Sequence, residues 1–453
     1  MLNFEEARSY IEQVSRSGSV LGLKNMYALM QELGNPQDEI PVVHIAGTNG
    51  KGSVGAFLAS ILKEAGLAVG RYCSPAVFEP LECWQYDGRN ITKEEYVSIL
   101  SQVKQACDIL TLREGIQPTV FEVETALAFV YFRQMKVDML LLETGLGGAT
   151  DATNVVKAPL ACVFTTISRD HMQFLGESLA EIASVKAGII KKDANVFSAV
   201  QEPEVCNILD AYMQKINPEQ RITYVAGKNL TLLSQKPGKL SFAYKHRNYQ
   251  TSLSGMYQMQ NAALAIEAAE GIFEKITRNV TIFSGIKSII LEKRTQGGII
   301  ESGIKHTSWP GRFEVIGENP LFVIDGAHND DAVKQLADTV RNCFTNQQVD
   351  FIIGILADKE HEKMLEHMMS FAARVFTVTP PNSRGLNGKI LAEEVRQWHD
   401  DVVSYDTIEE AVHQAVDHSR ENGYPIVAFG SLSYLGRLKE CYKQIGESRM
   451  RDV

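Results

Sequence analysis

The stretch HIAGTNGKGSVGAFL, residues 44–58, decides the fold of the N-terminal half of the chain. It continues the short apolar segment PVVHIA at 41–46 and leads into residues 51–66, which have helical periodicity. Glycines let a backbone wrap around an anion, and a helix N-terminus adds the positive end of its dipole. We therefore predict a phosphate-binding loop in which Lys51 reaches the terminal phosphates and which is formed by Gly47, Thr48, Asn49, Gly50, Lys51, Gly52 and Ser53.

The spacing of this loop differs from the Walker A pattern G-x-x-x-x-G-K-[ST]. With Gly50 and Lys51 as the Gly-Lys pair, Ile45 occupies the first glycine position and Gly52 the Ser/Thr position. This difference argues against an ordinary P-loop kinase. The alternative reading, a strand–helix turn with a solvent-exposed lysine, is disfavoured by the strand before the loop and the helix after it.

Length and composition limit the classes of protein that fit. A chain of 453 residues suits two or three domains. Its net charge of −10 argues against nucleic acid as a partner. There is no apolar stretch of transmembrane length and no secretion signal, so we expect a cytoplasmic protein that does not bind membranes. Seven cysteines without a CxxC pair predict thiols in a reducing compartment and no zinc site.

Strands alternate with helices along most of the chain, which predicts parallel sheets covered on both faces. In the N-terminal half, helices are expected at 4–14, 23–33, 120–136 and 177–191, and buried strands at 137–145, 158–167 and 195–200. Residues 226–254 alternate like antiparallel strands, and a helix is expected at 258–275.

A second, smaller α/β domain is predicted in the C-terminal third. Strands are expected at 321–327, 349–356, 374–380 and 425–431, with helices at 330–343, 361–372, 389–398, 407–420 and 434–445. The fold class is thus α/β: an N-terminal P-loop-type ATPase domain with a small antiparallel subsheet (1–295), a linker (296–309) and a C-terminal Rossmann-like doubly wound domain (310–453). In such sheets, ligands bind beyond the carboxyl ends of the strands.

An ordered set of motifs resembles the folylpolyglutamate synthase/dihydrofolate synthase branch of the Mur ligase superfamily. The motifs span residues from about 20 to 435 and are LGNP, AGTNGKGS, GLGG, DATNVV, DHMQFLG, KAGIIK, WPGRFEVI, DGAHN, LADKE and GSL. The resemblance implies a monomeric ATP-dependent acid–amino-acid ligase. ATP would phosphorylate the carboxylate of a dihydropteroate or folate, and the amine of L-glutamate would displace phosphate. ATP, two Mg²⁺ ions and a K⁺ ion are the cofactors that it implies.

The resemblance also assigns residues to the metal ions. Ser74, Glu143 and His171 match the family's Mg²⁺ ligands, although histidine is an unusual ligand for magnesium. Lys186 matches a lysine that the superfamily carbamylates, which would make it a further ligand near the second metal. Val185 stands where an acidic neighbour is usual. The expected catalytic residues are Lys51, Glu143, His171 and Lys186.

The remaining contacts follow from the same resemblance. ATP-binding positions outside the loop are Asn261, Arg312, Asp325 and His328. Phe121 and Asp151 would hold the pterin of the acceptor, by stacking and by hydrogen bonds. The alternatives for these two residues are a core aromatic and a helix cap. Ser383, Arg384 and Lys359 would bind glutamate.

Three residues depart from the family pattern near the expected acceptor site. Ala76 replaces a histidine, and Cys83 and Ala149 stand where arginines are usual. These departures motivate two alternative functions: a ligase of the same superfamily with a non-folate carboxylate acceptor, or a ligase-derived nucleotide-binding sensor.

Overall fold

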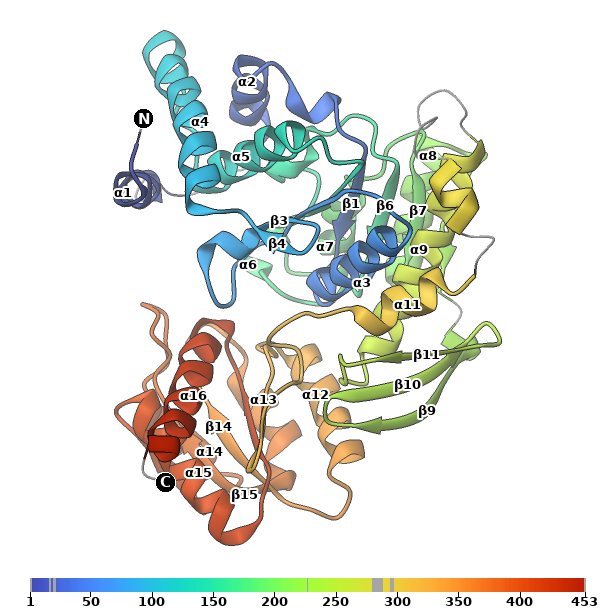
Figure 1. The fold of residues 1–453 in the computed structure, drawn as a ribbon. Coiled ribbons are helices and arrows are strands. Elements are labelled where there is room, and N and C mark those ends of the chain that lie inside the picture. Colours follow the sequence, from blue (N-terminus) through green and yellow to red (C-terminus); the bar gives the residue numbers. More distant parts are fainter. Residues whose placement is uncertain are drawn as a thin grey trace. The chain divides into compact units, whose positions relative to one another are not determined.

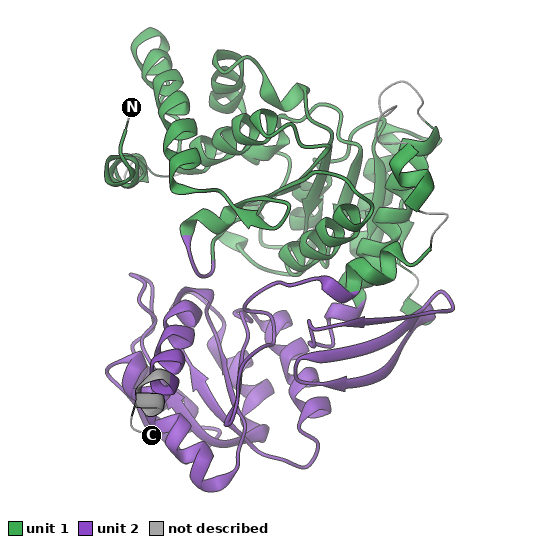
Figure 2. Cartoon of the chain, in the orientation of Figure 1, with its two compact units in different colours: residues 1–76, 80–228, 260–304 green, residues 77–79, 229–259, 305–453 purple. Residues whose placement is uncertain are grey.

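The computed structural model describes residues 2–15, 18, 22–225, 227–278, 288–293 and 297–451 of the 453-residue chain (Figure 1). The chain divides into two compact units (Figure 2): unit 1 comprises residues 1–76, 80–228 and 260–304, and unit 2 comprises 77–79, 229–259 and 305–453. A short part of the stretch SPAVFEPLECW, residues 77–79, therefore belongs to unit 2.

Unit 1 is built on an eight-stranded sheet with the order β4-β3-β2-β5-β1-β6-β7-β8. Neighbours from β2 to β8 are parallel, whereas β3 and β4 form an antiparallel edge. Every residue of the central strands β1 and β5 is buried, as expected for strands covered on both faces. The strands are β1 (Val42–Ala46), β2 (Val69–Tyr72), β3 (Trp84–Tyr86), β4 (Arg89–Asn90), β5 (Met139–Glu143), β6 (Ala161–Phe164), β7 (Asn195–Ser198) and β8 (Thr223–Tyr224).

Two buried clusters hold the helices of unit 1 to this sheet. One packs α1, α2, α4 and α5 around Tyr72, Trp84 and Leu142, and the other packs α7 and α8 around Phe164 and Val196. The helices are α1 (Phe4–Ser15), α2 (Lys24–Glu32), α3 (Lys51–Glu64), α4 (Lys93–Glu114), α5 (Val120–Gln134), α6 (Met172–Leu175), α7 (Leu179–Ala187), α8 (Pro203–Ile216), α9 (Gln258–Arg278) and α11 (Ile299–His306).

Local sequence sets where the two long helices of this cluster begin. Thr92 before α4 and Thr119 before α5 each accept a hydrogen bond from the backbone amide of the third helical residue. The glutamate side chain at that third position accepts one from the threonine's own backbone amide, so both form capping boxes. The sequence analysis missed α4 and α8, and the short strands β2, β3 and β4 at one side of the sheet. These strands have only two to four residues each, too few for a clear alternation.

Unit 2 contains a six-stranded sheet with the order β12-β13-β17-β14-β15-β16, parallel except for β12 at one edge. Alternate residues of its strands enter different clusters: Phe351 and Ile353 pack with α12, α13 and α14, whereas Ile352 packs with α15 and α16. Helices thus cover both faces. The elements are β12 (Glu314–Glu318), β13 (Leu321–Ile324), α12 (Asp330–Cys343), β14 (Val349–Ile353), α13 (His361–Met368), β15 (Ala372–Thr377), α14 (Gly388–Val395), β16 (Val402–Ser404), α15 (Ile408–Asn422), β17 (Ile426–Phe429) and α16 (Leu435–Arg451).

A separate antiparallel sheet with the order β11-β10-β9 also belongs to unit 2. Its strands are β9 (Leu230–Lys236), β10 (Lys239–Tyr244) and β11 (Arg247–Thr251). The predicted α/β class is confirmed: two mainly parallel sheets and one small antiparallel sheet. The limits 1–295, 296–309 and 310–453 stay a prediction; α11 lies inside the predicted linker, and residue 296 lies outside the described residues.

One predicted helix is too long. The helix expected at 361–372 ends as α13 at Met368, because Met369–Phe371 form a 3-10 turn and β15 begins at Ala372.

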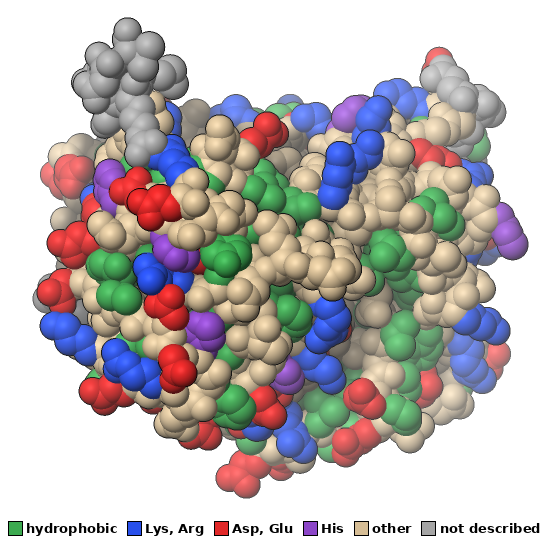
Figure 3. Space-filling view, turned by 90° about the horizontal axis from the view of Figure 1, so that it is seen from below, with side chains coloured by type: hydrophobic (Ala, Val, Ile, Leu, Met, Phe, Trp, Pro, Cys, Tyr) green, Lys and Arg blue, Asp and Glu red, His purple; other side chains and the backbone are tan. Residues whose placement is uncertain are grey.

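On the face drawn in Figure 3, basic side chains lie interspersed with acidic ones. Among the helices of the described residues, none is both long and apolar enough to cross a bilayer.

Candidate active site

The phosphate-binding loop joins β1 to α3 and needs glycine at two positions. Gly47 has φ +151° and Gly50 has φ +93°, values that residues with a side chain rarely adopt. A Cβ atom at Gly47 would lie 1.9 Å from Thr165 Oγ1, and one at Gly50 would lie 2.5 Å from Asn261 Oδ1. Asn261 of α9, predicted to contact ATP, therefore packs directly on the loop.

Residues after the neighbouring strand β6 fix the loop in place. The backbone amides of Thr48 and Asn49 donate to the carbonyl of Thr166 over 2.8 and 3.3 Å. The Thr48 hydroxyl donates to the carbonyl of Ser168 over 2.9 Å. The sequence reading missed Thr166 and Ser168 as supports. The available signal was their position at the end of a predicted parallel strand, where ligand-binding loops gather.

Lys51 lies between the loop and a carboxylate. Its Nζ donates to the carbonyl oxygens of Gly47 and Thr48 over 3.3 and 3.4 Å, and lies 3.8 Å from Glu143 Oε1. Glu143 is the last residue of β5 and is buried, so the lysine partly compensates its charge. The structure thus brings the predicted catalytic residues Lys51 and Glu143 together.

Lys186 is a buried lysine directed at the same loop. Its Nζ donates to the carbonyl of Gly47 over 2.9 Å. Burial, and then the charge of Lys51, lower the pKa of Lys186 to about 7. Glycine permits this placement: a Cβ at Gly148 of the GLGG segment would lie 2.8 Å from the carbonyl of Lys186, so only a bare backbone fits against α7 there.

Asp151 caps the short 3-10 helix Ala152–Val155. Its carboxylate accepts hydrogen bonds from the amides of Leu146 and Thr153 and from the Thr153 hydroxyl, over 2.5–3.0 Å. Burial raises the pKa of Asp151, and these hydrogen bonds oppose that rise. Thr153 in turn contacts the buried His44 at 2.8 Å. In this structure Asp151 is therefore a helix cap, which is the alternative role considered from the sequence.

Phe121, the second predicted pterin contact, lies in the first turn of α5. A Cβ at Gly145 would lie 2.4 Å from its ring, so the ring packs on the backbone two residues after Glu143. Its ring centroid is 6.2 Å from that of Tyr72. The ring is partly buried and reaches the vicinity of the β5 carboxyl end.

The remaining predicted metal ligands have different environments. Ser74 is partly buried, and His171 is exposed at the start of α6 with φ +53°. In the described part of the chain, no three His, Cys, Asp or Glu side chains lie close enough to hold a metal ion. The predicted set contains only two such residues beside a serine and a modified lysine, so it stays a prediction.

The ATP-binding candidates of unit 2 surround Asp325, directly after β13. Its carboxylate accepts hydrogen bonds from the Tyr257 hydroxyl at 2.5 Å and from the amides of Phe313 and Ala327 at 2.7 and 2.8 Å. Burial raises the pKa of Asp325. The carboxylate thus orders the backbone next to Arg312. The Arg312 guanidinium packs on Gly326, because a Cβ at that glycine would lie 2.3 Å from its Nη1. The sequence analysis assigned no role to Tyr257.

His328 follows in the same DGAHN turn. Its Nδ1 lies 2.8 Å from the carbonyl of Gly326, which accepts only if Nδ1 carries the proton. Nε2 is then the acceptor nitrogen of the neutral ring. Asn329 caps α12 by accepting from the amide of Ala332. The turn therefore holds Asp325 and His328, and Arg312 packs against it at Gly326.

The glutamate-binding candidates lie on two loops beyond adjacent strands. Lys359 follows β14, and Ser383 and Arg384 follow β15. The amide of Ala357 donates to the carbonyl of Arg384 over 2.8 Å, and Arg384 Nη1 lies 3.0 Å from Asp358 Oδ2. The structure thus brings these loops together at the carboxyl end of the unit 2 sheet, with an exposed guanidinium.

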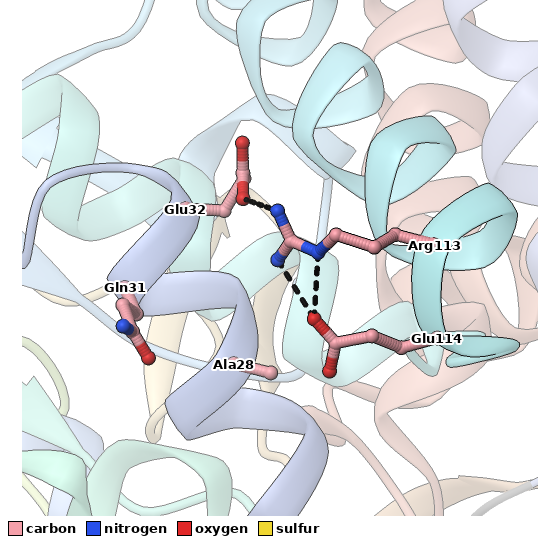
Figure 4. A pocket seen from close by; sticks show the side chains of 5 residues that line it. All are labelled: Ala28, Gln31, Glu32, Arg113 and Glu114. Atoms are coloured by element: carbon pink, nitrogen blue, oxygen red, sulfur yellow. Dashed lines mark hydrogen bonds and ion pairs between the residues drawn. The ribbon is translucent and has the colours of Figure 1, made fainter.

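A polar hollow of about 330 Å³ lies on another part of unit 1 (Figure 4). Residues of α2 and the last turn of α4 line it. Arg113 points across it to Glu32 at 3.0 Å and to Glu114 at 2.7 Å. Since two carboxylates already pair with its arginine, the hollow is a poor site for an anionic ligand and is separate from the phosphate-binding loop.

Family models match both parts of the chain. Residues 45–269 match the Mur ligase middle domain, and residues 311–432 match the Mur ligase, glutamate ligase domain. A dihydrofolate synthase/folylpolyglutamate synthase of Bacillus subtilis is 32% identical over 97% of this chain and 99% of its own. The chain belongs to the Mur ligase superfamily, in its folylpolyglutamate/dihydrofolate synthase branch.

Solved structures of this branch have the same fold. Mycobacterium tuberculosis folylpolyglutamate synthase complexed with ADP has a TM-score of 0.82 at 25% identity, covering 97% of this chain and 99% of that one. A folylpolyglutamate synthase in complex with AMPPCP and folate has a TM-score of 0.79 at 28% identity, covering 97% and 100%. The resemblance predicted from the motifs is thereby confirmed.

Proposed function

We propose that this protein is an ATP-dependent ligase that joins L-glutamate to the carboxylate of a dihydropteroate or folate. The observation that carries the proposal is the compact phosphate-binding loop with Lys51 beside Glu143 and Lys186, in a chain of this ligase branch. A non-folate acceptor and a nucleotide sensor are not favoured, since the relatives that span the chain are folate ligases.

The reaction has two steps. An acceptor carboxylate oxygen attacks the γ-phosphorus of ATP, and the bond to ADP breaks. The amine of glutamate then attacks the acyl carbon, phosphate leaves, and the nitrogen loses a proton to give the amide. Loop amides and Lys51 neutralise the developing phosphate charge in the first step. On this proposal, Lys51 exchanges its present contact with Glu143 for the phosphates.

Magnesium ions fit the donor set that the resemblance names. Glu143 is a buried carboxylate 3.8 Å from the Lys51 ammonium, and the Ser74 hydroxyl supplies a further oxygen. Glu143, Ser74 and His171 are the proposed ligands. The ions would neutralise the transferring phosphoryl group. A K⁺ ion is proposed from the resemblance alone.

Lys186 is proposed to carry a carbamate. Its lowered pKa leaves a substantial fraction of neutral amine near neutral pH, and only that form adds CO₂. The product is an anion and a released proton. Buried opposite Lys51, a negative charge would replace a repulsive lysine pair by an attractive contact, which supports the modification.

The other contacts are proposed by position in the family motifs. Asn261, Arg312, Asp325 and His328 serve ATP, Phe121 and Asp151 the acceptor, and Ser383, Arg384 and Lys359 glutamate. The exposed Arg384 guanidinium suits a carboxylate. We further propose a monomeric cytoplasmic enzyme without nucleic-acid or membrane partners; the seven cysteines, all present as thiols, support a reducing compartment.

The decisive assay measures ADP release from Mg-ATP by the purified protein with L-glutamate and, in turn, dihydropteroate or tetrahydrofolate. Glutamate-dependent turnover with at least one folate is expected. Turnover that requires some other acid would instead identify a non-folate ligase.

A charge-removing variant tests the loop itself. Lys51→Ala removes the cation assigned to the phosphates, so we expect turnover to fall at least a hundredfold, in the range known for loss of one such stabilising group. The exposed Lys192→Ala is the matched control. Near-normal activity of Lys51→Ala would contradict the assigned role.

A further inference from the structure

Glu124 is an acidic residue in unit 1 to which the family motifs assign no role. It lies on α5 one turn after Phe121, and Phe121, Glu124 and Thr125 share a helix face by their spacing of three and four residues. Trp84 Nε1 donates to the backbone carbonyl of Glu124 over 3.2 Å, which places this part of α5 against β3. Glu124 is therefore a neighbour, on this helix face, of the ring proposed to stack on the acceptor.

Its carboxylate has no partner of opposite charge among the residues that the structure describes. Within the described residues, no hydrogen bond or ion pair reaches the Glu124 side chain, and desolvation alone raises the pKa of Glu124 to about 7. Burial, and then the charge of Glu124, raise the pKa of Tyr72 well above its ordinary value. A desolvated carboxylate without donors costs free energy that a ligand with N–H groups would recover.

The carboxylate that the family motifs assign to the pterin is already occupied. Asp151 accepts three hydrogen bonds from Leu146 and Thr153 and is almost fully buried. A carboxylate accepts about four hydrogen bonds in total. Asp151 can therefore accept about one further hydrogen bond from a ligand, whereas both oxygens of Glu124 can still accept hydrogen bonds.

The order of residues along the site indicates which end of the acceptor Glu124 meets. Glu143 ends β5 beside Lys51, Gly145 follows and packs on Phe121, and Glu124 lies about 4.5 Å farther along the axis of α5. The reacting carboxylate must lie at the phosphate end. At the far end, another carboxylate would be repelled by Glu124, whereas a hydrogen-bond donor would be attracted.

We propose that Glu124 is a specificity-determining residue that accepts hydrogen bonds from the N–H donors of the acceptor's amino-substituted heterocycle. The inference rests on the proposed folate ligase function. It adds a residue that the ligase motifs do not contain. A 2-amino-4-oxopyrimidine edge offers two adjacent donors that match the two oxygens of a carboxylate.

Direct binding tests this assignment. Folate is titrated into wild type, Glu124→Gln and the surface control Asp108→Asn, each saturated with a non-hydrolysable ATP analogue. We expect Glu124→Gln to raise the dissociation constant for folate about tenfold or more, with nucleotide affinity and melting temperature unchanged. Asp108→Asn removes an exposed carboxylate of the same unit and should bind like wild type.

An analogue without the 2-amino group separates a contact from a structural role. Wild type should bind this analogue at least several-fold more weakly than folate, and Glu124→Gln should bind the two ligands nearly equally. Equal losses in both proteins, or tighter folate binding by Glu124→Gln, would overturn the proposal. Failure of the ligase function appears differently, as wild type without folate-dependent ADP release.

Discussion

His44 shows how one buried side chain couples stability to pH. The Thr153 hydroxyl donates its only proton to Asp151, so it accepts from His44 Nε2–H, and Nδ1 is buried without a hydrogen-bond partner in the described chain. Protonation would place a charge on that nitrogen. Burial, and then Lys191, accordingly lower the pKa of His44 to about 3.

This gives a pH prediction. The folded pKa lies below the ordinary value of about 6.5, so the unfolded chain binds more protons between these two values. The free energy of unfolding should therefore fall as pH decreases below 6.5, by up to about 1.4 kcal/mol per pH unit from this group. In His44→Gln, the free energy of unfolding should fall less steeply with decreasing pH, as measured by urea unfolding at pH 7, 6 and 5. Identical slopes in both proteins would contradict the assignment.

Lys186 gives a prediction about covalent state. We expect continuous electron density for a three-atom carboxylate group on its Nζ in crystals grown with bicarbonate. Turnover of protein depleted of CO₂ should rise on addition of bicarbonate, whereas Lys186→Ala should be weakly active and unresponsive. An unmodified lysine at high resolution, together with bicarbonate-independent activity, would rule out the carbamate.

At the scale of the element, the loop between β1 and α3 depends on the absence of side chains. Gly47→Ala would place a Cβ 1.9 Å from Thr165 Oγ1 at φ +151°, so the loop must move. We expect nucleotide affinity to fall at least tenfold while the protein still folds, measured by titration with an ATP analogue and by circular dichroism. Gly446→Ala, in open space within α16, is the matched control. Unchanged affinity would show that the loop tolerates displacement.

Element predictions succeeded where hydrophobic patterns were long. The buried runs of β1 and β5 and the alternation of β9, β10 and β11 were recognisable in the sequence. The short strands β3 and β4 were not recognisable, because β3 gains order from pairing with β2, and β4 from pairing with β3, rather than from their own pattern.

At the scale of the whole molecule, the state of association can be tested directly. With a mass of 50.3 kDa per chain, light scattering after size exclusion should give a single species near that value at micromolar concentration. A species near twice that mass would contradict the proposed monomer. The measured mass should not change when nucleotide is added.

The sequence by itself determined the class of fold, the phosphate-binding loop and the family. Those features depend on local patterns: hydrophobic period, glycine spacing and the order of short motifs. Only the tertiary structure decided how acidic and basic side chains are used. Asp151 is engaged by Leu146 and Thr153, Asp325 by Tyr257, and Glu124 is left without donors. Hydrogen-bond partners far apart in sequence meet only when strands and helices pack, so no local pattern distinguishes a satisfied carboxylate from an available one.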